Sequence, residues 1–294
     1  GWQQRYDALM PLASACRLAA DWEGLSAATD EAVAAAEAAG DVERAAMAAR
    51  GVTDGAVWQA RSHGVVHEPA VAALRRALAG LPEGDGDLRC RAMLALASEL
   101  YYASAPQERR ALVDEALAMA RRIGDPALLQ HALVTAFVAT WWPSSAPSRL
   151  ALVEEAAARA RAAGDAPAEA TAETLRAAVL GELGRIPEMW VAIRAARSRA
   201  TPLRMAYLML VLDAMEAPWL AMSGRSEEAD HVLDRLARLF EQTALPQGAD
   251  GYSGALVTVR LYQGRLAEVL PRLDELVGRS KLPVAPVVAA LLLR

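Results

Sequence analysis

The chain of 294 residues is 54% hydrophobic, 23% charged and only 5% aromatic, with a formal net charge of −5. An apolar content this high excludes a disordered chain and is typical of closely packed helices rich in alanine and leucine. The acidic balance gives no electrostatic reason for this segment to contact the phosphate backbone of nucleic acid directly.

The cysteines and the longest apolar stretches indicate where in the cell the protein is expected. Cys16 and Cys90 stand alone, outside any CxxC pattern, as expected for reduced thiols. The apolar runs 205–222 and 284–293 either carry charges or are too short to cross a bilayer. We therefore expect a cytoplasmic protein without membrane contact.

Helix pairs separated by short turns are predicted from the N-terminus onward. The first four pairs cover 2–20 with 25–39, 42–61 with 68–81, 88–103 with 107–123, and 126–142 with 148–163. The fifth, sixth and seventh pairs turn at Gly184, Gly224 and Gly264, and a final helix begins near Pro286.

The dipeptide Gly-Asp recurs at the turns between pairs, at 40–41, 124–125 and 164–165. A glycine accepts the positive φ that ends many helices, and an aspartate accepts an N–H group from the first turn of the next one. We therefore predict that each glycine ends a helix and that each aspartate caps its successor.

A Gly-Arg-x-x-Glu frame begins at Gly184, Gly224 and Gly264, with a spacing of 40 residues. Equal steps back from Gly184 reach other small residues, namely Ser144, Ser104, Gly64 and Gly24. A period of this length indicates stacked helical units that share one continuous core. We expect residues 1–294 to form a single domain. Because the chain begins with Gly1 and ends without a helix cap, we also expect it to be an excised fragment of a larger protein.

The repeated unit resembles the tetratricopeptide repeat, although its 40-residue period is longer than that family's typical unit. Gly224, Glu228 and Ala229 match the turn glycine and the first small packing residue of the second helix. The resemblance implies an all-α fold, a right-handed α-solenoid of about seven tetratricopeptide-like helix pairs.

The order of motifs is similar to the C-terminal tetratricopeptide-like region of large actinobacterial STAND/AAA-type ATPase transcriptional regulators. The segments that carry this likeness are Arg121-Arg122-Ile123-Gly124-Asp125-Pro126, Trp142-Pro143, the Gly-Arg hinges, and Tyr252-Ser253-Gly254-Ala255 before Gln263-Gly264-Arg265-Leu266-Ala267-Glu268. It implies a ligand- or protein-sensing arm of a bacterial transcriptional regulator, whose ATP hydrolysis and DNA binding would belong to other domains. These residues contain neither a phosphate-binding loop motif nor a basic helix-turn-helix.

Aromatic residues gather just before two consecutive hinges of the period. Tyr101 and Tyr102 recur one period later as Trp141 and Trp142, and Trp58 precedes the hinge at Gly64. In tetratricopeptide-like folds the end of each first helix contributes to the concave groove, so these five rings are the predicted ligand-binding residues. The alternative is that each ring staples neighbouring repeats together.

The expected groove floor is small and uncharged, which favours a small apolar ligand or a protein or peptide partner. Its positions are Ser14, Ser98, Val134, Val138, Ala178, Ala214 and Thr258. Self-association into a homo-oligomer stays open.

We expect no cofactor, no metal and no catalytic residues. His63 and His67 have a zinc-like spacing, but Gly64 between them disfavours the helix that such a site needs. Besides the sensing arm, two other functions stay open: a stand-alone adaptor for protein–protein interaction, and an enzyme that uses an aromatic-lined repeat cavity.

Overall fold

A computed structural model describes residues 1–18, 21–54, 56, 61, 64–243 and 246–269, and within these ranges all regular elements are helical. The first six helices form three pairs: α1 (Trp2–Leu18) with α2 (Trp22–Ala38), α3 (Val42–Ala49) with α4 (Glu68–Gly80), and α5 (Asp87–Glu99) with α6 (Pro106–Ile123). The next six form three more: α7 (Pro126–Ala139) with α8 (Ala146–Ala163), α9 (Ala166–Glu182) with α10 (Ile186–Ala200), and α11 (Ala206–Met222) with α12 (Ser226–Thr243). The remaining elements are α13 (Pro246–Tyr262) and the 3-10 turns η1 (Leu100–Tyr102), η2 (Pro143–Ser145) and η3 (Leu266–Val269).

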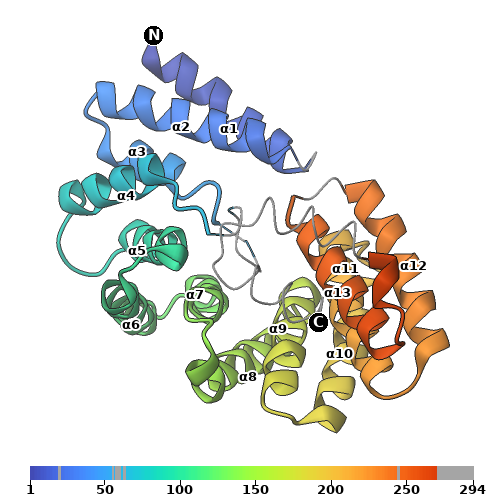
Figure 1. Ribbon diagram of the computed structural model, residues 1–294. Helices are drawn as coiled ribbons and strands as arrows, with labels where there is room; N and C mark the ends of the chain where they lie inside the picture. The colour runs from blue at the N-terminus through green and yellow to red at the C-terminus, as the bar shows by residue number, and fades with distance from the viewer. Residues whose placement is uncertain (19–20, 55, 57–60, 62–63, 244–245, 270–294) are drawn as a thin grey trace.

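The pairs follow one another around a curved path that nearly closes, so that α1 and α2 lie near α11 to α13 (Figure 1). Each helix packs on its successor, and first helices of neighbouring pairs also pack together, as α5 does on α7 and α11 on α13. This is the architecture of a helical-repeat solenoid, so the predicted fold class is confirmed. The final helix predicted near Pro286 lies outside the described residues.

The turns between pairs confirm the Gly-Asp prediction at all three places. Gly40, Gly124 and Gly164 have φ values of 71°, 74° and 67°. The aspartate after each glycine accepts a hydrogen bond from a backbone N–H of the next helix, at 3.0, 2.6 and 2.9 Å. Each new helix therefore starts at a position that its own sequence specifies.

Helix α3 is shorter than the predicted span of 42–61, because it ends at Ala49. Local side chains compete with the helix for its backbone groups at this point: the hydroxyl of Thr53 donates to the carbonyl of Arg50. The guanidinium of Arg50 also donates to Asp54, at 2.7 Å. Gly51, the residue after Arg50, has a low helix propensity. The predicted span was too long because the helical pattern in the sequence continues past Ala49, whereas the helix itself does not.

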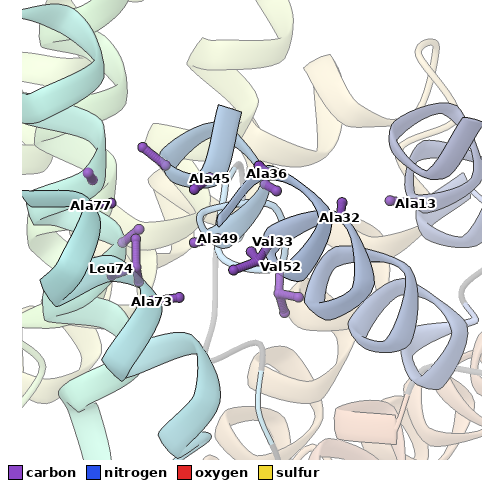
Figure 2. Packing of buried hydrophobic residues seen from close by; sticks show 14 of the residues in the cluster. Ala13, Ala32, Val33, Ala36, Ala45, Ala49, Val52, Ala73, Leu74 and Ala77 are labelled. Atoms are coloured by element: carbon purple, nitrogen blue, oxygen red, sulfur yellow. The ribbon is translucent and has the colours of Figure 1, made fainter. Parts of the chain in front are cut away.

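Small residues dominate the core of the first repeats. Alanines from α1 to α4 meet in one cluster with Val33, Val52 and Leu74 (Figure 2). Side chains of this size let the helices approach closely, which suits the high alanine content of the chain. Further clusters continue the core from α5 to α13.

The two ends of the described solenoid touch each other. Trp22, at the start of α2, packs both against the core cluster of the first repeats and against the cluster formed by α11, α12 and α13. Two described residues between α3 and α4 also contact first helices of later pairs: Arg61 binds Glu99 of α5 at 2.9 Å, and Asp54 lies 3.6 Å from His131 of α7. The expected groove is therefore shared with a segment of the chain itself.

Candidate ligand-binding site

Four of the five predicted aromatic residues lie at two consecutive hinges. Tyr101 and Tyr102 belong to the 3-10 turn that follows α5, and Trp141 and Trp142 lie between the end of α7 and the next 3-10 turn. They stand just beyond the last turn of each first helix rather than within it. Trp58 lies outside the described residues.

The two hinges are in direct contact. The hydroxyl of Tyr101 donates to the carbonyl oxygen of Trp141 at 2.8 Å, and the rings of Tyr101 and Tyr102 meet edge to face, with centroids 4.9 Å apart. Burial raises the pKa of Tyr101, so its hydroxyl stays a donor. Trp141 meets Phe137 edge to face and packs against the core cluster of α7 to α11. Tyr101 and Trp141 therefore join neighbouring repeats.

The third hinge of the period lies at Ser104 and the fourth at Ser144. A fully buried arginine supports the fourth hinge. The guanidinium of Arg149, on α8, lies over the rings of Phe137 and Trp141 at 4.9 and 5.0 Å. Its Nε donates to the hydroxyl of Ser145 at 2.9 Å, and its terminal nitrogens bind the carboxylate of Glu182. Ring faces, a hydroxyl and a carboxylate together surround this charge.

Arg109 occupies the equivalent position one period earlier, on α6, but lacks the polar partners of Arg149. Its guanidinium lies 5.1 Å from the ring centres of both Tyr101 and Trp142 and donates to the carbonyl oxygen of Tyr101. The Nε atom of Arg109 is buried and has no hydrogen-bond partner among the described residues. Burial lowers the pKa of Arg109.

The difference between the two arginines follows from the register of the repeat. Ser145 and Glu182, which bind Arg149, correspond one period earlier to Ala105 and Trp142. Neither alanine nor tryptophan can accept a strong hydrogen bond from a guanidinium. The third hinge thus repeats the arginine of the fourth and replaces both of its polar partners.

Arg109 is unusual among the buried charges of the described residues. Six charged side chains are buried there: Glu99, Arg109, Arg149, Glu169, Glu173 and Asp213. The other five each have an oppositely charged partner within 3.0 Å. Arg109, with 8% of its surface exposed, has no such partner in the described part of the chain. Because an isolated buried charge is costly, this position stands out from the structural ion pairs.

A half-open pocket adjoins the unpaired arginine. It has a volume of about 370 Å³ and is lined by Pro106, Gln107, Arg109, Arg110 and Trp142. Trp142 contributes its ring, over which Arg110 also lies at 5.2 Å. Pro106 and Gln107 come from the first turn of α6. The hinge therefore presents one aromatic ring beside two positive charges, in place of the uncharged surroundings expected from the sequence.

The sequence pattern did not lead us to expect buried arginines at the hinges, although their spacing offered a signal. Arg109 and Arg149 are one period apart, and Trp142 falls in the same column as Glu182. An arginine in a helical segment is ordinarily a surface residue, so its burial becomes visible only in the packed structure.

The histidines do not form a metal site in the described residues, where no group of three or more His, Cys, Asp or Glu side chains could hold an ion. His67 instead lies 2.9 Å from Asp30, and His63 falls outside the described ranges. Among the described helices, none combines the length and the hydropathy that a membrane span requires.

Comparison with known proteins supports the fold. No protein-family model matches the chain, and no curated protein matches it. Among solved structures, the chain is similar to a Signal Transduction ATPase with Numerous Domains (STAND) protein with a tetratricopeptide repeat sensor from Pyrococcus horikoshii, with a TM-score of 0.64 and 12% identity. The match covers 89% of this chain and 39% of that protein, so this chain spans about two fifths of its length. At this identity the likeness shows the fold alone.

Proposed function

We propose that this chain is the sensing arm of a bacterial transcriptional regulator of the STAND ATPase type, and that it binds an effector molecule or a partner protein. One observation carries the proposal: the solenoid matches, over 89% of its length, a STAND protein that is described as having a tetratricopeptide repeat sensor. In such a protein the repeat domain has a binding role rather than a catalytic one. ATP hydrolysis and DNA contact would belong to domains outside these residues.

The two aromatic hinges are the proposed place of recognition. They combine partly exposed rings with a pocket whose size falls in the range of small-molecule sites. They also connect the third and fourth repeats through the bond from Tyr101 to Trp141, so an occupant of the pocket would touch two repeats. The proposed output is a change in the angle between repeats, because the curvature of a solenoid follows from the small rotation between neighbouring repeats.

The proposal can be tested on the complete gene and on the chain itself. Determination of the full reading frame should show a nucleotide-binding module in the same polypeptide. A natural start codon just before Trp2, with no such module, would contradict the regulator and favour a stand-alone adaptor.

Native mass spectrometry of the purified chain supplies the second test. A sensing arm should retain a small molecule or a specific protein at a fixed stoichiometry, and Trp142→Ala should release it without unfolding the chain. A retained species that Trp142→Ala leaves bound would place recognition elsewhere on the solenoid.

A further inference from the structure

The pocket at the third hinge holds a positive charge that the described part of the protein leaves unneutralised. Arg109 is more than nine-tenths buried, has a buried Nε without a partner and lines the pocket together with Arg110. Arg110 forms no ion pair with any described residue either. No acidic side chain lines the pocket among the described residues.

The fourth hinge shows what an arginine in this position takes when a partner is available. Arg149 has an oxygen acceptor at Nε, from Ser145, and a carboxylate at its terminal nitrogens, from Glu182. At the third hinge the residues in the same register are Ala105 and Trp142. One anionic group with two oxygens would supply both missing interactions, since a guanidinium binds such a group through a fork of parallel N–H donors.

We infer that the pocket formed by Pro106, Gln107, Arg109, Arg110 and Trp142 binds a small organic anion. Its carboxylate or phosphate group pairs with Arg109, as Glu182 pairs with Arg149, and its planar or apolar body lies against Trp142. This inference deepens the proposed function by naming the chemical class of the effector, and it rests on that function for its biological meaning.

The surroundings of the pocket fit an anion better than a neutral molecule. The first turn of α6 borders it, and the N-terminus of a helix carries a partial positive charge. The nearby acid, Glu108, is held by Arg75 at 2.9 Å. The ring of Trp142 can accept a flat apolar group, and the pocket volume of about 370 Å³ suits a small molecule.

The test uses aromatic probes that differ in their charged group. 2-Naphthoate carries a carboxylate, 2-naphthyl phosphate a phosphate, and 2-naphthol is neutral near pH 7. Isothermal titration calorimetry on the whole chain should show one saturable site for at least one anion, with about tenfold or greater preference over 2-naphthol. The stronger of the two anions then identifies the headgroup. Added salt should weaken anion binding.

Two variants connect that binding to the unpaired charge. Arg109→Met keeps the length and apolar stem of the side chain without its charge and should reduce anion binding at least tenfold. Arg185→Gln removes an exposed arginine from another hinge and should leave binding unchanged, as a control for net charge.

A third variant supplies the missing partner from the chain itself. Trp142→Glu reproduces the arrangement of Arg149 with Glu182, so it should abolish anion binding and melt at a higher temperature than Trp142→Gln. The comparison of glutamate with glutamine keeps size constant, so the difference in melting temperature reports neutralisation of Arg109 rather than loss of the ring.

Several results would overturn the inference. They are equal binding of 2-naphthol and the anions, no binding of either anion at millimolar concentration, unchanged binding in Arg109→Met, or equal stability of the Glu and Gln variants. Each concerns the pocket alone. Retention of a protein or a neutral molecule in native mass spectrometry would still support the sensing arm, so the two proposals can fail separately.

Discussion

The aromatic hinges and the glycine hinges occupy the same place in the period but use arginine in opposite ways. At Gly184 and Gly224 the backbone turns with φ values of 71° and 77°. The arginine that follows each glycine forms an exposed pair with a glutamate three residues later, Arg185 with Glu188 and Arg225 with Glu228. At the aromatic hinges 3-10 turns replace the glycine, and the arginines at 109 and 149 are buried under rings.

This difference shows that a repeat can keep its period while it changes the chemistry of its turn. A glycine hinge needs only backbone freedom, and its charges lie in solvent, where an ion pair contributes little. An aromatic hinge fills the same space with large side chains and encloses a charge. The aromatic hinge borders a pocket with directional donors, so we expect recognition there and a scaffold role for the glycine hinges.

The largest effect expected is the contrast between two adjacent tryptophans. Trp141 packs in the core cluster of α7 to α11 and against Arg149, so Trp141→Ala should destabilise the chain by about 3 kcal/mol. Trp142→Ala removes a ring at the edge of a pocket and should cost about 1 kcal/mol, mainly from lost contacts with two guanidinium groups. Urea unfolding of both variants measures the difference.

Tyr102→Ala extends that comparison to the preceding repeat, and its unfolding free energy should resemble that of Trp142→Ala. If Trp142→Ala and Tyr102→Ala unfold the chain as severely as Trp141→Ala, without a separate loss of binding, these rings are core staples. The proposed recognition site would then be withdrawn.

The second contrast is between the paired and the unpaired arginine. Glu182→Gln leaves Arg149 buried without a counter-charge and should cost about 2–3 kcal/mol, below the full value for a buried pair because Glu182 is partly exposed. Arg109→Met removes a charge that has no partner, so stability should change by less than about 1 kcal/mol. Chemical denaturation at constant pH checks both. A large loss of stability in Arg109→Met would mean that the ring and carbonyl contacts of Arg109 are structural.

The third expected effect tests the backbone of the glycine hinges. Gly224 has a φ of 77°, and a Cβ atom there would meet nothing within 4 Å, so Gly224→Val isolates the backbone strain, about 1–2 kcal/mol. Gly254, inside α13, is equally uncrowded but lacks a positive φ. Gly254→Ala should therefore stabilise the chain slightly. Equal melting temperatures for Gly224→Val and the wild-type chain would refute the strained hinge.

The smallest effect concerns acid. Hydrogen bonds from the adjacent arginines lower the carboxyl pKa values of Glu188 and Glu228. A lowered pKa in the folded state adds stability above the unfolded pKa of about 4.3, and this stability is lost as the pH falls further. Thermal melts should be recorded from about pH 6 to about pH 3, the range in which these groups titrate. As the pH falls, the melting temperature of the wild-type chain should decrease slightly more steeply than that of Glu228→Gln. Identical slopes would show that the exposed pair contributes nothing.

Most of the scaffold is predictable from local sequence. Gly164 followed by Asp165 marks a helix end and the next helix start, and the structure places both there. These are interactions between residues a few positions apart, so residue type and spacing suffice. The exception is α3, which ends at Ala49 before its periodicity does, next to the point where the hydroxyl of Thr53 donates to the carbonyl of Arg50.

Only part of the candidate site could be predicted from local sequence. The double aromatics at 101–102 and 141–142 indicated that two consecutive hinges lie side by side, because the period aligns them, and the bond from Tyr101 to Trp141 shows that contact. Their division into a core-packed Trp141 and a pocket-lining Trp142 depends on which neighbouring repeat each ring meets. Contacts between side chains of neighbouring repeats cannot be read from the sequence directly.

The 40-residue period and the turn residues are enough to specify a helical solenoid, since each depends on contacts within one repeat or between adjacent ones. The contact of Trp22 with the last repeats and the burial of Arg109 depend on how those repeats curve as a whole. Curvature adds up small rotations at every interface, and the energy of a buried charge depends on everything packed around it. For that reason Arg109 looked like a surface residue until the third and fourth repeats were packed together.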